Sequence, residues 1–358
     1  MSSDAERAIS IAGAACCTSV GYSLGASVAA MAAGITNFAQ SDVRGALGTA
    51  ATVAQVAGIE PDLPRGQRMA ALARLAAEEL RPLLSALVTD AVPMIVALPA
   101  DIDGEEVRLV EEALDNMAPA RRVEQWAYPH GRAGGFAALA AGRKLLQSDD
   151  VELVVVGGVD SLCARPTLLA LVQADRLLGP GTEGTVPGEA AAFVVLARAD
   201  HPAAGLPTAI GLRDVALGRA EVPFLTADRV NAGGLAATFG RLREKGAARV
   251  DRVMAAHSGE GYFARAFSHA YLRQVELMPE PLDVVLTADR VGDVGAAAPL
   301  IGIAFATWFM AQGKTGDPAP RMLIYTESDT GEIGAAIVEG RPQAWWRPTP
   351  ASSSQRFA

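Results

Sequence analysis

Several side chains capable of acid–base chemistry lie where strand-like segments end. His257 follows the apolar run 253–256 and opens the turn His257-Ser258-Gly259-Glu260, and Asp293 stands in a glycine-rich loop. An imidazole placed in this way can act as a general base on an acyl substrate, with Glu260 or Asp293 orienting its ring. The alternative is a histidine that only completes hydrogen bonds inside the core.

A second group of polar residues precedes a segment rich in glycine and alanine. His130, Gly131 and Arg132 stand directly before the helix expected at 134–146. Because a helix N-terminus carries partial positive charge, a cation there is disfavoured by roughly 0.3–1 kcal/mol when exposed, and by more when buried. A buried Arg132 therefore requires a carboxylate or a bound anion beside it. The alternative places Arg132 at the surface.

Apolar runs of strand length alternate with helical patterns along the chain, which favours βαβ units, mainly parallel sheets and the α/β class. We expect strands at 9–15, 93–98, 123–128, 151–157, 190–196, 208–217, 253–257, 283–286, 322–326 and 333–338. We expect helices at 24–34, 68–87, 105–117, 134–146, 232–244, 263–278 and 296–312. The element order of 1–200 recurs more loosely in 201–340, with a boundary near 200–206, and a Pro- and Ser-rich tail follows at 341–358.

The bulk composition narrows the classes of function. Half of the 358 residues are hydrophobic, a fifth are charged, and the formal net charge is −9. A nucleic-acid surface needs clustered Lys and Arg, so this acidic balance argues against one. Cys16, Cys17 and Cys163 have neither disulfide nor metal-ligand spacing, so we expect no metal, no cofactor and a reducing, cytoplasmic setting. The uncharged stretch 9–36 is interrupted by Gly and Ser, and we expect strand, turn and helix there, not a membrane span.

Three motifs follow one another within 128–197. They are the helical segment GRAGGFAALAAGRKLL, the strand and glycine turn VVVGGVDS, and the strand entry GEAAAFVVL. Together they resemble the core of a β-ketoacyl synthase, or ketosynthase, a condensing enzyme of the thiolase fold. The resemblance implies a thiolase-like α/β fold with two pseudo-repeated βαβαβαββ halves in αβαβα layers.

The same resemblance locates the catalytic positions of the family, and most of them are altered. Arg132 stands at the position of the nucleophilic Cys, and an arginine cannot be deprotonated or serve as the acyl acceptor. His257 matches the first catalytic His, whereas Gly292 stands at the second and Thr287 at the position of a Lys. In the C-terminal glycine loop, which helps to form the oxyanion hole, only Gly331 is kept.

In the family these loops converge on one acyl pocket, and the pocket residues implied here are His130, Arg132, Glu260, Asp293 and Gly331. We expect Arg132 to pair with Asp293, Glu260 or Glu332 and to fill the former acyl site.

We therefore expect a degenerate ketosynthase-like protein, a pseudoenzyme that is not a condensing enzyme and acts by protein binding. Its role would be that of a scaffold, an adaptor or a non-catalytic partner subunit. The alternative is an acyltransferase or acyl-thioester-processing enzyme that uses His257 with a changed mechanism. An open acyl tunnel at His257 would favour the enzyme, and a filled one the binding protein.

The resemblance also implies partners. Thiolase-fold proteins dimerise through the strand before the nucleophile helix, so a homodimer is expected through the strand from Val123 to Tyr128. Other partners that it allows are a related active subunit, a toxin-export component served by an adaptor, or an acyl carrier protein. A carrier protein would contact basic residues, although a solvated charged face is the plainer interpretation of this cluster: Arg121, Arg122, Arg143 and Lys144. No nucleic acid or membrane partner is expected.

Overall fold

The first half of the chain builds five strands of a large sheet and four helices that pack on it. The computed structural model describes residues 8–45, 48–88, 91–115, 117, 119–206, 209–312 and 320–340. The strands are β1 (Ile9–Thr18), β4 (Val92–Ala97), β5 (Ala120–Tyr128), β6 (Leu153–Ser161) and β7 (Glu189–Arg198). The helices are α1 (Leu24–Ala32), α2 (Arg65–Leu87), α3 (Gly104–Leu114) and α4 (Gly134–Leu145). The strand order is β5-β4-β6-β7-β1, with β4 parallel to β5 and β6, and β7 antiparallel to β6 and β1.

The second half repeats this arrangement. Its strands are β8 (Ile210–Arg219), β9 (Arg252–Ala255), β10 (Val284–Leu286), β11 (Arg321–Glu327) and β12 (Glu332–Glu339). Its helices are α6 (Gly233–Glu244), α7 (Gly261–Arg273), the short α8 (Ala288–Val291) and α9 (Ala298–Gln312). The strand order is β10-β9-β11-β12-β8, with the same sequence of parallel and antiparallel pairs. The pseudo-repeat is therefore present in strand order as well as in element order.

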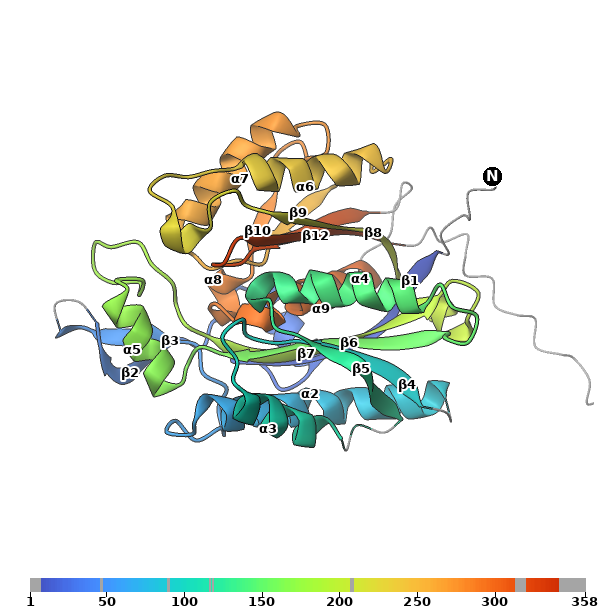
Figure 1. Ribbon diagram of the computed structural model, residues 1–358, viewed down its shortest axis with the longest axis horizontal. Helices are drawn as coiled ribbons and strands as arrows, with labels where there is room; N and C mark the ends of the chain where they lie inside the picture. Colours follow the sequence, from blue (N-terminus) through green and yellow to red (C-terminus); the bar gives the residue numbers. More distant parts are fainter. Residues whose placement is uncertain are drawn as a thin grey trace, which may run out of the picture.

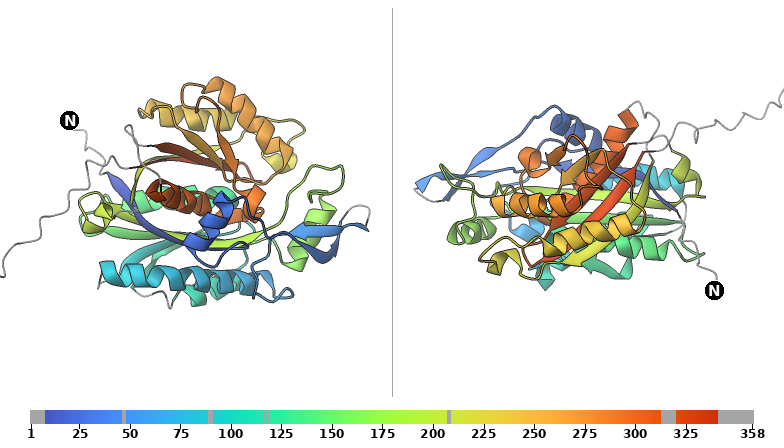
Figure 2. Two further views of the ribbon diagram at one scale, coloured as in Figure 1. Left: turned by 180° about the vertical axis from the view of Figure 1, so that it is seen from behind. Right: turned by 90° about the horizontal axis from the view of Figure 1, so that it is seen from above.

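The elements stack in five layers (Figures 1 and 2). Helices α2 and α3 cover the outer face of the first half-sheet, and α6 and α7 cover the outer face of the second. Helices α4 and α9 lie between the two half-sheets. This is the αβαβα layering that was expected.

The central layer is built for burial on all sides. The sequence of α9, APLIGIAFATWFMAQ, is apolar around its whole circumference, as a helix enclosed by two sheets requires. Gly135 lets α4 approach α9 closely, because a Cβ at this position would lie 2.6 Å from Leu300 Cδ2. Strand β6 is buried along its whole length and β7 along all but its last residue, which explains their unbroken apolar runs.

The two half-sheets join along one edge. Strand β1 pairs with β8 from Ile9 opposite Leu212 to Ile11 opposite Ile210, which makes one ten-stranded sheet. The chain crosses between the halves after β7 ends and before β8 begins. The division into 1–200 and 201–340 stays a prediction, since both halves share the central helices.

Sequence patterns did not predict one small unit. A hairpin of β2 (Ala39–Arg44) and β3 (Ala50–Val53), together with α5 (Arg165–Gln173), extends to the left of the sheet in Figure 1. Its β2 sequence, AQSDVR, is mostly exposed and lacks the alternation of a half-buried strand. The helix expected at 263–278 also ends early, because α7 stops at Arg273 and the side chain of Gln274 bonds to the carbonyl of Ala236.

The stretch 9–36 contains β1 and α1, as expected. Among the helices that the structure describes, none combines the length and apolarity that crossing a bilayer requires. The tail 341–358 lies outside the described residues.

Candidate functional site

Arg132 lies in a single turn, η2 (Gly131–Ala133), between β5 and α4, and is only 5% exposed. Its Nε donates to Asp293 Oδ1 at 3.0 Å, and its Nη2 donates to the other oxygen of the same carboxylate. Its Nη1 donates to Asp329. The expectation that Arg132 is buried against a carboxylate is confirmed for Asp293. Glu332, another of the three carboxylates considered, binds Arg219 and Thr330 instead.

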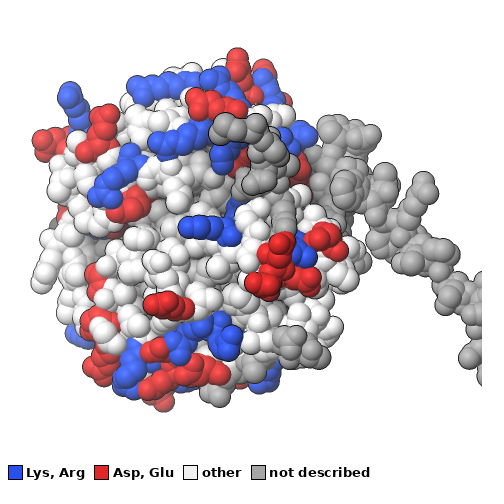
Figure 3. All heavy atoms as spheres, turned by 45° about the vertical axis from the view of Figure 1, so that its right-hand side comes forward, with Lys and Arg blue, Asp and Glu red and all other residues white. Residues whose placement is uncertain are grey.

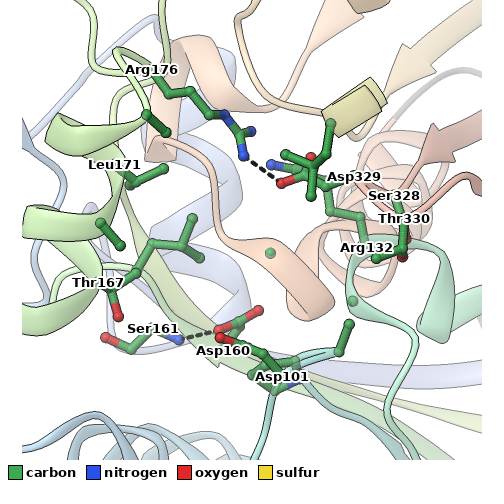
Figure 4. Close-up of a pocket in the computed structure, with 18 of the residues that line it drawn as sticks. Asp101, Arg132, Asp160, Ser161, Thr167, Leu171, Arg176, Ser328, Asp329 and Thr330 are labelled. Carbon is green, nitrogen blue, oxygen red and sulfur yellow. Dashed lines mark hydrogen bonds and ion pairs between the residues drawn. The ribbon is translucent and has the colours of Figure 1, made fainter. Parts of the chain in front are cut away.

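A second arginine extends this cluster. Arg176 follows α5, and its guanidinium donates to both oxygens of Glu260 at 2.8 and 2.7 Å. It also donates to Asp329 Oδ2 at 2.7 Å (Figure 4). Glu260 therefore pairs with Arg176, and of the three carboxylates considered Arg132 takes Asp293. Asp329 accepts from both arginines and joins them into one two-arginine network, which consists of Arg132, Arg176, Glu260, Asp293 and Asp329.

Arg132 and Asp329 stay charged across the ordinary pH range. Burial alone would raise the pKa of Asp329, but Arg132 and Arg176 hold it at about 2. Burial acts to lower the pKa of Arg132, and Asp293 and Asp329 nevertheless raise it well above its usual value. A guanidinium held in this way can neither attack a thioester nor accept a proton.

The backbone amide at the start of α4 is also occupied. The N–H of Ala133 donates to Ser328 Oγ at 2.8 Å, and that hydroxyl donates to the carbonyl of His130 at 2.7 Å. Ser328 lies in the loop between β11 and β12, where Gly331 turns the chain at φ +91°. This amide is therefore bound within the protein and is not left to stabilise an oxyanion.

Gly292, which the sequence resemblance places at the position of the second family His, leaves no room for a side chain. Its φ is +72°, and a Cβ there would lie 2.7 Å from the carbonyl oxygen of Val186 and 3.0 Å from Ala54 Cβ. A histidine at this position would require the backbone to move.

His257 is enclosed in the core of the second half. Its Nδ1 contacts the carbonyl oxygen of Ser258, which can only accept, so Nδ1 carries the proton. Its Nε2 lies 3.3 Å from Tyr325 Oη, and its ring stacks on Phe263 at 5.4 Å between centroids. Burial lowers the pKa of His257 to about 4, so the ring is neutral at pH 7. Both nitrogens are engaged inside the protein, which is the arrangement of a core histidine.

A cavity of about 400 Å³ opens beside the network (Figure 4). Of the residues expected in the pocket, Arg132 lines this cavity, whereas His257, Glu260, Asp293, His130 and Gly331 are not among its described lining residues. His130 is exposed and packs edge-on against Tyr128. The charged residues that line the cavity come from several segments: Arg65, Asp101, Arg132, Asp160, Arg176 and Asp329. Within the described parts of the chain, no group of three or more His, Cys, Asp or Glu side chains is placed to hold a metal ion.

Comparison with known proteins identifies the fold. A chain of the ishigamide ketosynthase/chain length factor superposes with a TM-score of 0.75, at 16% sequence identity over 94% of this chain and 100% of that one. The fold is that of the ketosynthases. A ketosynthase (ApeO) in complex with its chain length factor (ApeC) from Xenorhabdus doucetiae gives a TM-score of 0.72, at 13% identity over 95% and 100% of the two chains. A third similar structure is AntDE:AntF, a type II polyketide synthase acyl-carrier protein in complex with its ketosynthase bound to the hexaketide. A chain of it superposes with a TM-score of 0.74, at 12% sequence identity over 94% of this chain and 100% of that one. No family model and no curated protein matches the sequence.

These likenesses establish the thiolase-like, ketosynthase-like fold that the sequence resemblance implied. At sequence identities of 11–16%, they show that the fold is shared but do not show a shared activity. What the site can do must therefore be argued from its own side chains.

Sequence reasoning missed two members of the two-arginine network. Asp329 lies two residues before Gly331, in a loop already expected to face Arg132, so its carboxylate was a usable signal. Arg176 stands in a segment between α5 and β7 that carries no motif, and nothing in the sequence marks it.

A buried carboxyl next to the network predicts an unusual pH dependence of stability. Glu327 ends β11 and is 2% exposed, and within the described residues neither of its oxygens has a hydrogen-bond partner. Burial, and next the charge of Asp329, raise the pKa of Glu327 to about 7. A carboxyl whose pKa is raised in the folded state destabilises that state when it ionises, so stability falls as the pH rises from about 4 to about 7.

We expect Glu327→Gln to remove this fall and to raise the free energy of unfolding at pH 8 by about 1–3 kcal/mol. Urea unfolding at pH 5 and pH 8 measures the effect, with the exposed Glu280→Gln as the matched control. A variant that is less stable than the wild type at pH 8 would contradict the assignment.

Proposed function

We propose that this protein is a non-catalytic, ketosynthase-like protein that acts by binding other proteins, as a scaffold, an adaptor or a partner subunit. The observation that carries the proposal is the state of Arg132. By the sequence resemblance it occupies the position of the nucleophilic Cys, and it is fixed there by ion pairs to Asp293 and Asp329. No acyl group can be accepted by such a residue.

The environment of His257 argues against the alternative, an acyl-processing enzyme that uses this histidine. A general base must reach the proton that it removes. The ring nitrogens of His257 are taken up by Ser258 and Tyr325, and its low pKa makes it a weak base at pH 7.

The proposal is tested by asking whether the protein becomes covalently acylated. The purified protein is incubated with acetyl-CoA and malonyl-CoA, and its intact mass is measured. We expect an unchanged mass, because no nucleophile is placed at the start of α4. A stoichiometric acyl adduct that disappears in Arg132→Ala or His257→Ala would overturn the proposal.

The proposal that this protein binds other proteins is supported by two of the similar structures. One is a ketosynthase in complex with its chain length factor, and the other is an acyl-carrier protein in complex with its ketosynthase. We extend assembly of this kind to the present chain as part of the proposal. A carrier protein held by the four basic residues named above is not favoured, because Arg143 is buried and donates to the carbonyl of Arg213. On the face seen in Figure 3, basic and acidic side chains are interspersed rather than gathered by sign.

We also propose that two copies pair through β5. This strand ends the sheet and pairs with β4 alone, so its outer edge offers backbone donors and acceptors. The register between β5 and β4 shifts partway along the strands, and the exposed Glu124 and Gln125 lie in this irregular part of β5.

We expect Gln125→Pro to weaken such a dimer at least tenfold, because proline removes a donor from the edge and Gln125→Ala does not. Sedimentation velocity over a concentration series measures the dissociation constant. A wild-type protein that sediments as a 37.0 kDa monomer at all concentrations would rule out the homodimer.

A cytoplasmic location belongs to the same proposal. It is supported by Cys16, Cys17 and Cys163, which are buried free thiols.

A further inference from the structure

The guanidinium groups that line the cavity are already neutralised. Arg65 donates to Asp101 at 2.8 Å and to the two oxygens of Glu106 at 2.8 and 2.6 Å. Arg132 and Arg176 are bound within the two-arginine network. A ligand anion entering the cavity would have to displace one of these carboxylates.

The charges around the cavity are unequal. The three guanidiniums of Arg65, Arg132 and Arg176 face six carboxyl groups that either bind them or line the cavity: Asp101, Glu106, Asp160, Glu260, Asp293 and Asp329. Burial raises the pKa of Asp160 to about 7, so this carboxyl adds its negative charge mainly above pH 7. The neutral ring of His257 does not offset the excess. The local field therefore favours a cation and opposes an anion.

Asp160 is the carboxyl best placed to meet a ligand. It lines the cavity, is 5% exposed, and has no cationic partner in the described structure. Its Oδ1 accepts from the N–H of Ser161 at 2.7 Å and its Oδ2 from the N–H of Ala296 at 2.8 Å. Each oxygen keeps a further lone pair for a donor. Figure 4 shows this carboxyl at the base of the cavity, between Asp101 and Ser161.

Apart from four hydroxyl side chains, those of Ser161, Thr167, Ser328 and Thr330, the rest of the lining is apolar or glycine. Pro99, Ala100, Leu162, Leu171 and Leu225 form much of it, and the volume of about 400 Å³ lies in the range of small-molecule sites. An aliphatic body can be buried against these side chains while a polar head meets Asp160.

We propose that this cavity binds a small aliphatic primary amine, with its ammonium group on Asp160 and its chain against the leucine-rich wall, and that it rejects acyl anions of the same length. The proposal rests on the proposed function, because it treats the site as one that binds and does not turn over its ligand.

Isothermal titration of the full chain with n-hexylammonium, hexanoate and 1-hexanol at pH 8 and constant ionic strength tests the proposal. We expect hexylammonium to bind at least tenfold more tightly than either of the others. Across butyl-, hexyl- and octylammonium, affinity should rise about three- to fourfold per methylene group, as burial of an aliphatic chain predicts. Hexanoate binding as tightly as hexylammonium would overturn the proposal, as would the absence of hexylammonium binding.

Two substitutions locate the ammonium group. Asp160→Asn should weaken hexylammonium binding at least tenfold, while the matched control Asp42→Asn, which lies in an exposed ion pair on β2, should leave it unchanged. If Asp160→Asn fails to fold, as thermal unfolding would show, Asp101→Asn serves instead and should weaken binding about threefold through the local field. Unchanged affinity in the folded variants would overturn the site. Absence of hexylammonium binding to the wild-type protein, without any acyl adduct, overturns only the ligand, whereas an acyl adduct overturns the proposed function.

Discussion

Replacing Arg132 with alanine lowers the free energy of unfolding by about 3–5 kcal/mol. The loss is large because Asp293, with 1% of its side chain exposed, is left buried without a cationic partner, and Asp329 loses one of its two arginines. Urea unfolding at pH 7 measures the change. The matched control is Arg165→Ala, which breaks an exposed pair with Asp42 and should cost no more than about 0.5 kcal/mol.

A second variant separates the ion pair from simple loss of packing. In Arg132→Ala/Asp293→Ala the orphaned carboxylate is gone, so we expect the double variant to be more stable than the sum of the two single losses predicts. A loss of less than about 1 kcal/mol in Arg132→Ala would show that Arg132 is solvated, and the account of a filled nucleophile position would fail.

The second large effect on stability is expected at the buried ion pair of Arg68 and Glu189, which no sequence pattern predicted. Arg68→Ala should lower the free energy of unfolding by about 3–5 kcal/mol. Arg68 on α2 donates to both oxygens of Glu189 at 2.8 and 2.7 Å, and both side chains are 0% exposed. Glu189 also accepts from the N–H of Val56 and the hydroxyl of Ser161, so one carboxylate holds several segments together.

The control for this prediction is Arg108→Ala, which removes an exposed pair with Glu112 within α3 and should change stability by less than about 0.5 kcal/mol. Arg68→Met/Glu189→Leu should be less destabilising than Arg68→Ala, because an apolar pair leaves no buried charge behind. Equal losses in Arg68→Ala and Arg108→Ala would contradict the assignment. So would a double variant that is less stable than Arg68→Ala.

Much of the fold follows from local patterns in the sequence. The unbroken apolar runs of β6 and β7 can only be strands buried on both faces, and the all-apolar α9 can only be an enclosed helix. The hairpin β2–β3 could not be predicted because its polar strand β2 lacks the alternation of apolar and polar residues that marks a half-buried strand. Helix α5 could not be predicted because it covers only a small, separate hydrophobic cluster.

The site was predictable only where electrostatics imposed a requirement. A buried cation at a helix start needs a carboxylate, and that argument led to Asp293. It could not choose among neighbouring loops, so Asp293, Glu260 and Glu332 stayed open as partners. It also could not find Arg176, which comes from the other side of the cavity. Gly292 is explained by backbone geometry, a positive φ with no space for a Cβ, which a sequence alone does not display.

If Arg132 fills the nucleophile position and His257 is a core residue, the protein should not turn over acyl thioesters. The most direct test is steady-state turnover of malonyl- and acetyl-thioesters by the purified protein, measured as thiol release and as decarboxylation, beside His257→Ala. We expect rates equal to the uncatalysed background for both proteins. Turnover by the wild type that is lost in a folded His257→Ala would show that His257 is catalytic and that the protein is an enzyme.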